Sequence, residues 1–248
     1  MVLLNVRLGI IFRHGLRSQL CEKGVNGGQE MREDFYFDLH VHSIYSKDSL
    51  LKPHEIIKIS KAKGIDAVAI TDHDTILGGL KAKSISQDSV MVIIGAEIKT
   101  DFGDLIGLFL NEEIRSRSFL DVADEIKAQD GIVILPHPYR RKRFPTTEML
   151  KNVNVIEEVN GRTSDELNCK AQFLAKNLSL PVVGGSDAHF SFELGNFMNC
   201  TKSPFFEEEE LRKRILSNNL TFFRKMNNIF VRDSCIFLSH FLKKMHIF

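Results

Sequence analysis

Short runs of β-branched and other apolar residues alternate with segments of helical periodicity between about Phe35 and Leu220. This alternation is typical of repeated strand and helix units, which build a parallel sheet of the α/β class. Since the helical segments lie between the strands all along the chain, seven strands fit one barrel better than two small sheets. We expect strands at residues 35–41, 66–72, 90–98, 104–110, 131–137, 153–159 and 180–187, and helices at residues 53–63, 119–129, 164–177 and 207–217.

The length of 248 residues is sufficient for one large domain with a buried core. Residues 1–33 resemble neither a strand nor a capped helix and end near three glycines, so they predict an N-terminal extension. Residues 34–220 would form the barrel domain. Residues 221–248 mix large apolar with basic side chains, as an amphipathic helix does, and we expect this tail to pack against the barrel or a second subunit; contact with a membrane surface is the alternative.

The charge balance excludes a generally basic nucleic-acid-binding surface, because 33 Lys and Arg face 32 Asp and Glu, for a net charge of +1. Any affinity for phosphates must therefore be local. The four cysteines form no CxxC pair, which favours reduced thiols. The apolar stretch at the N-terminus is too short and too charged to span a membrane, and it lacks a clear cleavage site. These features predict a cytoplasmic protein without stable membrane insertion.

Titratable side chains follow five of the predicted strands, directly after the apolar run. The carboxyl ends of all strands in a parallel barrel open onto one mouth, where such side chains meet. In the first strand, the period of two turns Asp38, His40 and His42 to the same face. The other clusters are Asp72, His73 and Asp74 after the second strand, Glu97 after the third, His137 after the fifth, and Asp187 and His189 after the seventh.

Several ionisable groups buried side by side are costly unless they are compensated, and divalent cations would compensate them. Imidazoles mixed with carboxylates, without a thiolate, favour zinc, manganese or iron over calcium or magnesium alone. More than six candidate ligands predict two or three ions, with Glu97 or Asp187 as a bridge. Such centres produce a metal-bound hydroxide near neutral pH and stabilise an in-line displacement at phosphorus, so hydrolysis of a phosphoester is the expected chemistry.

The segments DLHVHS, ITDHD, GAEI, PHP and GSDAH, in this order, resemble the signature of the polymerase and histidinol phosphatase (PHP) superfamily. The resemblance extends from about Asp34 to Leu220. It implies a distorted (β/α)7 barrel that resembles a TIM barrel, a trinuclear metal site and phosphoesterase activity. YSKDSLLKPHEII and ITDHDT look most similar to the branch that acts on nucleoside bisphosphates and oligonucleotides.

The resemblance also implies roles for particular residues. Asp48 matches, with one residue inserted, an aspartate that follows the first motif in the family. Asp104 stands where many relatives have a histidine, and this departure leaves the number of ions open. Asp72 and Asp74 flank a ligand and would orient it, with helix capping as the alternative. The implied metal ligands are His40, His42, Asp48, His73, Glu97, Asp104, His137, Asp187 and His189, of which Glu97, Asp187 and His189 are also the candidate catalytic groups.

Candidate substrate-binding residues follow two further strands. Arg140 and Arg141, in the run Tyr139 to Arg143, would bind a second phosphate or a nucleic-acid backbone; a solvated charge run is the alternative. Asn160 and Arg162 occupy the next strand end. The expected substrate is a small phosphomonoester, a nucleotide or a short oligonucleotide. A histidinol-phosphate phosphatase and a non-catalytic metal-stabilised module are the alternatives, and the oligomeric state stays open.

Overall fold

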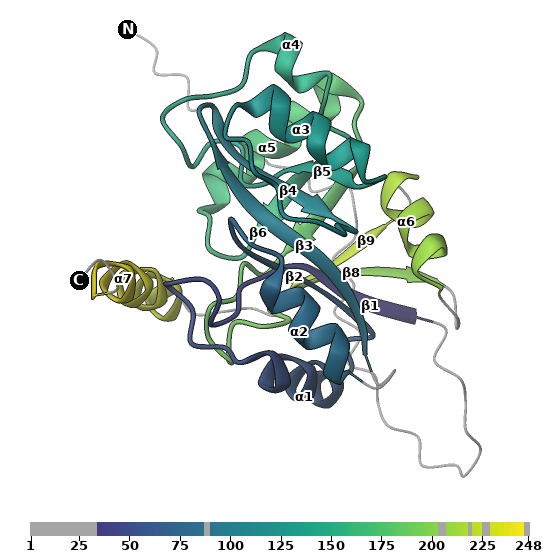
Figure 1. Cartoon of the computed structure of the whole chain (residues 1–248). Helices are drawn as coiled ribbons and strands as arrows, with labels where there is room; N and C mark the ends of the chain where they lie inside the picture. Colours follow the sequence, from purple (N-terminus) through teal and green to yellow (C-terminus); the bar gives the residue numbers. More distant parts are fainter. Residues whose placement is uncertain (1–33, 87–89, 203–206, 218–219, 225–228, 246–248) are drawn as a thin grey trace, which may run out of the picture. The chain divides into compact units, whose positions relative to one another are not determined.

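The computed structural model describes residues 34–86, 90–202, 207–217, 220–224 and 229–245, all within one compact unit; the predicted N-terminal extension lies outside them. Figure 1 shows the arrangement of the elements. The strands are β1 (Asp34–Val41), β2 (Ala67–His73), β3 (Met91–Thr100), β4 (Gly103–Leu108), β5 (Ile132–Leu135), β6 (Val155–Asn160), β7 (Val182–Gly185), β8 (Phe197–Lys202) and β9 (Thr221–Arg224). The helices are α1 (Pro53–Lys63), α2 (Leu77–Ile85), α3 (Phe119–Ala128), α4 (Thr147–Leu150), α5 (Asp165–Leu178), α6 (Glu208–Leu216) and α7 (Ile229–Met245).

The strands form one sheet in the order β7-β6-β5-β4-β3-β2-β1-β8-β9. This sheet curls until its β7 edge meets β1, where Val41 and Ala188 form a parallel bridge and the His42 N–H donates to the Ala188 carbonyl oxygen over 2.9 Å. The expected α/β barrel, distorted and nearly closed, is therefore confirmed.

Strand β4 departs from the parallel order that the sequence predicts. It runs antiparallel to both β3 and β5, because only Asp101 and Phe102 separate β3 from β4 and leave no room for a crossover helix. The first residues of β4 consequently lie level with the last residues of β3, and Asp104 pairs with Lys99. The reversal brings Asp104 to the barrel mouth from the start of its strand.

The barrel interior is apolar at one end and polar at the other. Alternate residues of the seven strands β1 to β7 form an apolar cluster, against which Leu211 and Ile215 of α6 pack. The interior face of β2 and β3 becomes polar toward the mouth. With a period of two, His73 lies on the same face of β2 as Ala69, and Glu97 lies on the same face of β3 as Ile93. The interior cluster consists of Phe37, Leu39, Ala67, Ala69, Ile93, Ile106, Leu108, Phe109, Ile132, Ile134, Val155, Val183, Leu211 and Ile215.

Strand β1 has a register shift between Asp38 and Val41. Phe37 and Leu39 belong to the interior cluster before the shift, whereas His40 and His42 reach the interior after it. Asp38 does not share their face as the period of two predicted. It is fully buried and accepts hydrogen bonds from the backbone N–H groups of Ser186 and Gly195, which tie β1 to the segments after β7.

The seam beside β7 is closed by the side chain of Asn199 on β8. Its amide donates to the carbonyl oxygens of Phe37 and Gly184 and accepts from the Gly184 N–H, over 2.8–3.2 Å. The side chain thus replaces a stretch of backbone pairing between β1 and β7. Strand β8, which the sequence analysis did not predict, is needed for this closure.

Helices α1 and α2 cover β1 to β3, and α3 and α5 cover β3 to β6, each with its own apolar cluster (Figure 1). Helix α1 has the predicted bounds. Helix α2 was not predicted because its sequence LGGLKAKSI contains two glycines, which disfavour a helix. A Cβ at Gly78 would collide with the Asp72 carboxylate, so this glycine allows the helix to approach the barrel mouth.

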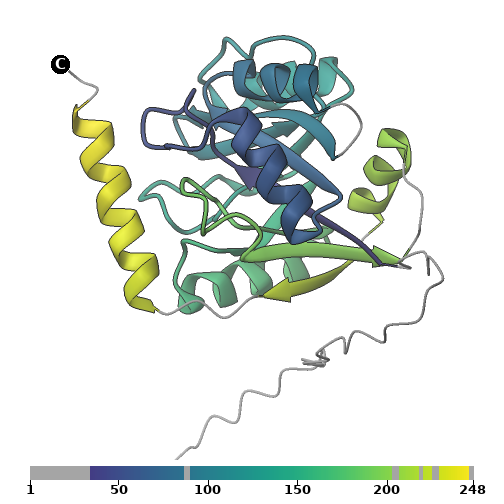
Figure 2. The ribbon, with the colours of Figure 1, turned by 90° about the horizontal axis from the view of Figure 1, so that it is seen from below.

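The segment after residue 220 contains both β9, which extends the sheet beside β8, and α7. An amphipathic helix was predicted in this region. Helix α7 lies along one side of the barrel (Figure 2). Among the described residues, no helix is both long and apolar enough to cross a bilayer.

Candidate metal centre

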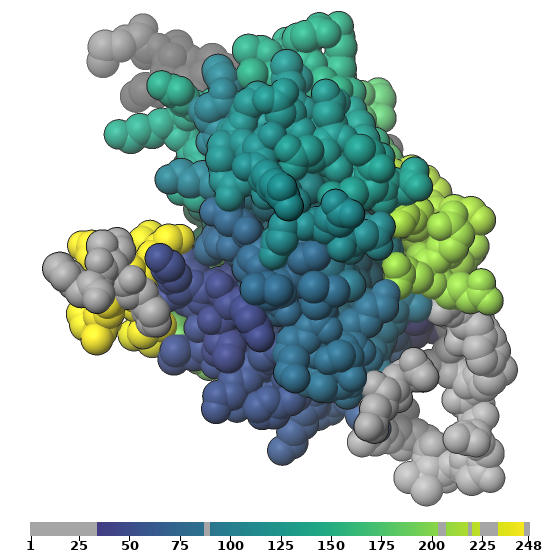
Figure 3. Space-filling model, viewed as in Figure 1, coloured from purple at the N-terminus to yellow at the C-terminus, as the bar shows by residue number. Residues whose placement is uncertain are grey.

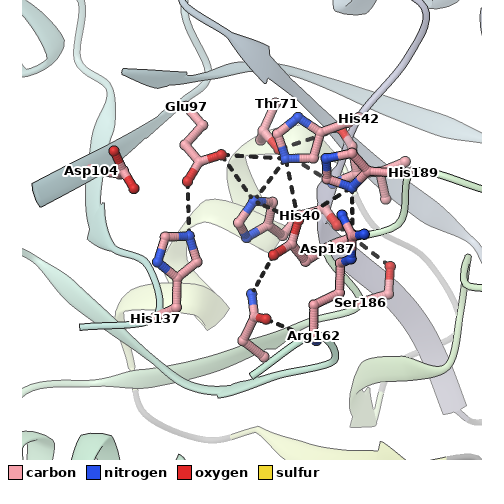
Figure 4. A network of polar contacts seen from close by, with 12 residues as sticks. His40, His42, Thr71, Glu97, Asp104, His137, Arg162, Ser186, Asp187 and His189 are labelled. Atoms are coloured by element: carbon pink, nitrogen blue, oxygen red, sulfur yellow. Dashed lines mark hydrogen bonds and ion pairs between the residues drawn. The ribbon is translucent and has the colours of Figure 1, made fainter. Parts of the chain in front are cut away.

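Nine side chains that we predicted as ligands come from the ends of six strands and meet at the barrel mouth. Figure 4 shows seven of them, all except Asp48 and His73. All are buried except His73, which is partly exposed. Their nitrogen and oxygen atoms form four overlapping groups, each within 4.8 Å: His42, His73 and His189; His40, His137 and Asp187; His40, His42 and Glu97; and Glu97, Asp104 and His137.

Glu97 lies at the middle of the cluster. Its Oε1 is 2.8 Å from Nε2 of His137, and its Oε2 is 3.2 Å from Nδ1 of His73 and 3.3 Å from Nε2 of His42. One carboxylate therefore faces histidines from three strand ends. This is the geometry expected of a carboxylate that bridges two ions.

Two ligand candidates have a backbone conformation that L-residues adopt rarely. His137 and Asp187 have φ angles of 30° and 54°. Each lies two residues after the end of its strand, where the chain leaves the barrel. Such conformations are typical of functional sites, where the surrounding structure offsets their cost.

The partners of three imidazoles determine which ring nitrogen carries the proton. His40 Nδ1 donates to Glu157 Oε1 over 2.9 Å, and His189 Nδ1 donates to the Asp187 carbonyl oxygen over 2.9 Å. His42 Nδ1 is 3.1 Å from Ser46 Oγ, whose single hydrogen goes to Asp72 Oδ1; Nδ1 must therefore be the donor. In each ring Nε2 faces the cluster, and its lone pair is available to a metal ion.

The two flanking aspartates differ in their surroundings. Asp72 is fully buried, accepts from Ser43 and Ser46, and so orients His42 through Ser46 rather than its neighbour His73. Asp74 instead accepts from the Lys99 N–H and pairs with Arg117 at 3.5 Å. The orienting role expected for Asp74 thus finds no counterpart in these contacts.

The pKa values of the cluster depart from their ordinary values because ionisable groups are buried beside one another. Burial lowers the pKa of His73, but the carboxylates of Glu97 and Asp48 outweigh this effect and raise it to about 10. Burial and the adjacent His42 lower the pKa of His189 to about 3. For Glu97 burial acts in the opposite direction, yet His73 and the other imidazoles hold its pKa well below the usual range.

The donor set fits divalent metal ions. Asp48 Oδ1 is buried without a hydrogen-bond partner, although it lies 3.6 Å from Nε2 of His189. His40 Nε2 and His42 Nε2 approach to 3.1 Å, and two lone pairs at that distance need a proton or a cation between them. Mixed imidazole and carboxylate ligands are those with which proteins bind divalent transition-metal ions.

The four predicted substrate-binding residues separate into three that reach the cluster and one that does not. Arg140 binds Asp187 Oδ2 at 2.8 Å, and Arg141 Nε binds Asp104 Oδ2 at 2.6 Å. Asn160 donates to Asp187 Oδ2 over 3.2 Å and is fully buried. Arg162 instead pairs with Glu193 and donates to Ser239 of α7, with only 8% of its side chain exposed.

The sequence analysis missed Glu157, a buried carboxylate of β6. Its Oε1 accepts from His40, and its Oε2 accepts from the His137 N–H and from Asn160 Nδ2. The signal was present in the strand VIEEVN, where the period of two places Glu157 on the face opposite to Glu158.

A nearly closed α/β barrel with a buried cluster of imidazoles and carboxylates at its mouth defines a metal-dependent hydrolase. The family model of the PHP domain matches residues 38–197, and the chain belongs to this family. The expected family and enzyme class, metal-dependent hydrolysis of a phosphoric ester, are therefore confirmed.

Individual proteins resemble the chain to different extents. It is 46% identical to an uncharacterized protein of Methanocaldococcus jannaschii over 114 residues, which are 41% of this chain and 67% of that protein. A probable phosphatase of Acetivibrio thermocellus is 28% identical over 224 residues, 74% of this chain and 91% of that protein. A two-domain protein of Bacteroides vulgatus, which contains a predicted PHP-like metal-dependent phosphoesterase, shares the fold with a TM-score of 0.67 at 19% identity, over 80% of this chain and 70% of that chain.

Proposed function

We propose that the protein hydrolyses phosphomonoesters of small molecules, with nucleotides as the first class to test, at a centre of two or three divalent ions. The observation that carries this proposal is a half-exposed guanidinium group beside a ligand set large enough for several ions. Arg141 contacts Asp104 through Nε, and 47% of its side chain is exposed. Four further N–H donors of this guanidinium are suited to the oxygens of a phosphate.

The groups of neighbouring donor atoms indicate which residues would hold each ion. His40 and Asp187, with Glu97 beside them, would hold one; Glu97, Asp104 and His137 a second; and His42, His73 and His189, with Asp48 beside them, a third. Divalent ions at such a centre lower the pKa of a bound water and neutralise charge on phosphoryl oxygens.

The chain's own residues orient the site. Asp187 Oδ1 faces Nε2 of His42 at 3.5 Å, whereas Oδ2 accepts from both terminal nitrogens of Arg140. Arg140 also donates to Asn160 and Thr163, so its guanidinium is held by the protein. Arg140 therefore positions Asp187, and Arg141 is the better candidate for direct contact with substrate.

The test is hydrolysis by the purified protein, with its bound metals measured, of nucleoside 3′,5′-bisphosphates, other phosphomonoesters, short RNA and DNA, and histidinol phosphate. We expect metal-dependent phosphate release that His42→Ala and Asp187→Ala abolish. Arg141→Ala should raise KM about tenfold, since a charge-assisted hydrogen bond contributes about 1.5–3 kcal/mol. Lys142→Ala, on the same loop and exposed, is the matched control. Full activity in chelated protein, or in both ligand variants, would refute the proposal.

A further inference from the structure

Helix α7 lies outside the barrel sheet but contacts three loops that surround the barrel mouth. The buried thiol of Cys235 lies beside Glu193, in the loop after β7. Ser239 Oγ accepts from Arg162, which follows β6, and Lys243 Nζ lies 3.0 Å from Asp48 Oδ2 in the loop after β1. In Figure 2 the C-terminal end of α7 approaches the loop after β1, and in Figure 3 the two segments adjoin.

These three contacts come from one stripe of the helix. Cys235, Ser239 and Lys243 are four residues apart and therefore share a face. Among the α7 side chains that the structure describes, large apolar ones on other faces are exposed: Phe237 to 75%, Phe241 to 53% and Leu238 to 42%. A helix held to the barrel by apolar packing would show the opposite distribution. The face directed at the mouth is small and polar, and it ends in an ammonium group.

We propose that Lys243 is a substrate-binding residue of the phosphoesterase centre, carried to the barrel mouth by α7. Its ligand is the dianionic phosphate group of the substrate. This inference rests on the proposed function, because it assigns a further binding residue to the same site.

The hydrogen-bond capacity of the two groups supports the proposal. The ammonium has three donors, and the contact with Asp48 Oδ2 uses one of them. The side chain of Lys243 is 47% exposed and that of Asp48 only 8%, so the remaining donors lie on the open side of a buried carboxylate. The other oxygen of Asp48 is the unpartnered one that faces His189. Asp48 thus has Oδ1 toward His189, whereas its Oδ2 contacts both His73 and the ammonium.

The position of Lys243 complements that of Arg141. Arg141 binds Asp104 next to Glu97, whereas Lys243 binds Asp48 next to His73. His73 Nδ1 is 3.2 Å from Glu97, so the two cations are at opposite ends of one row of ligand candidates. A phosphate above this row has a cation available on each side.

The experiment measures binding of inorganic phosphate to the metal-loaded full-length protein by calorimetry, together with metal content and steady-state kinetics. Lys243→Met retains the aliphatic stem and removes the charge. We expect its phosphate affinity to be about 10–100-fold weaker, as for the loss of a charge-assisted hydrogen bond, with KM raised and metal content unchanged. Lys243→Arg should restore most of the affinity. Lys244→Met, the adjacent exposed lysine, should bind phosphate as the wild type does.

A purely structural role of Lys243 predicts different results. Lys243→Arg keeps the positive charge, whereas Lys243→Met keeps only the aliphatic stem. If Lys243→Arg binds phosphate as weakly as Lys243→Met, the charge is not responsible for the affinity and the proposal is wrong. Unchanged affinity in Lys243→Met, or a gain in activity, would also overturn it. Phosphate binding is measured without turnover, so a protein inactive on every substrate would refute the proposed function separately.

Discussion

The Nδ1 atom of His40 lies 2.9 Å from Oε1 of Glu157, and both side chains are buried. The same carboxylate accepts hydrogen bonds from the His137 N–H and from Asn160 through Oε2. Glu157 therefore connects residues from the ends of three strands. It keeps the proton of His40 on Nδ1 and directs Nε2 toward the centre of the cluster.

Glu157→Gln should weaken metal binding about 10–100-fold, the usual loss when the carboxylate partner of a ligating histidine is changed. A glutamine amide cannot accept at both ends, so one donor among His40, His137 and Asn160 loses its partner. The measurement is competition for the metal with a chelator of known affinity. Glu158→Gln is the matched control, because Glu158 is adjacent and pairs with Gln172 on the other face of β6. Equal affinities of the two variants would contradict the role of Glu157.

A second prediction concerns Ser46, which accepts from the His73 N–H and from His42 Nδ1 and donates to Asp72. Ser46→Ala removes this partner from His42 Nδ1 and from the His73 N–H, whereas Asp72 keeps its two hydrogen bonds from Ser43. We expect weaker metal binding and a loss of about 1–3 kcal/mol in the free energy of unfolding of the metal-free protein.

The control for this variant is Ser60→Ala. Among the described side chains, the Ser60 hydroxyl is one of the few that are buried without a hydrogen-bond partner. Its removal should change stability by less than about 0.5 kcal/mol. Urea unfolding and metal titration of both variants provide the comparison. A destabilisation by Ser60→Ala as large as that by Ser46→Ala would argue against a special role of the Ser46 contacts.

Metal loading should release protons. With a pKa of about 10, His73 carries a proton at pH 8 in the metal-free protein, whereas a metal ligand must be unprotonated. Binding at pH 8 therefore releases a proton from His73, and metal affinity rises with pH until this group is deprotonated. The raised pKa stabilises the metal-free fold fully below about pH 6.5, the ordinary histidine value, and this contribution is lost as the pH approaches 10.

Calorimetry of metal binding in buffers with different ionisation enthalpies counts the protons released. We expect His73→Asn to release fewer than the wild type, and His54→Asn, a change at an exposed histidine, to release the same number. A proton count near zero for the wild type would show that His73 is neutral before metal arrives.

The strand ends were predictable because each places titratable residues directly after an apolar run, as in the step from Ile134 to His137. Two other features were not predictable from the sequence, because they depend on long-range geometry. The reversal of β4 follows from its two-residue connection to β3, which is too short for the helix that a repeated strand and helix pattern predicts between parallel strands. The seam closed by Asn199 exists only once β7 and β8 lie on either side of it.

Contacts between different elements were the other source of error. Glu157 of β6 contacts His40 of β1, and Ser46, in the loop after β1, accepts from the His73 N–H of β2. Arg162 was expected at the substrate because it follows β6, yet its partners are Glu193 and Ser239. Position at a strand end predicted which elements meet, but the hydrogen-bond partner of each side chain decided its role.

We predict that Asp104 determines how many ions the centre holds. It is 4% exposed, forms one donor group with Glu97 and His137, and pairs with Arg141 at 2.6 Å. Asp104→Asn removes the negative charge from this group but leaves the groups that contain His42 intact. We therefore expect the variant to retain one ion fewer than the wild type after gel filtration, as measured by elemental analysis and by anomalous scattering from crystals.

Asp124→Asn, at an exposed position on α3, should retain the full number. Asp104→His supplies an imidazole at the same position and should restore the ion. If Asp104→Asn holds as many ions as the wild type, then Asp104 serves only to hold Arg141, and the second ion depends on Glu97 and His137 alone.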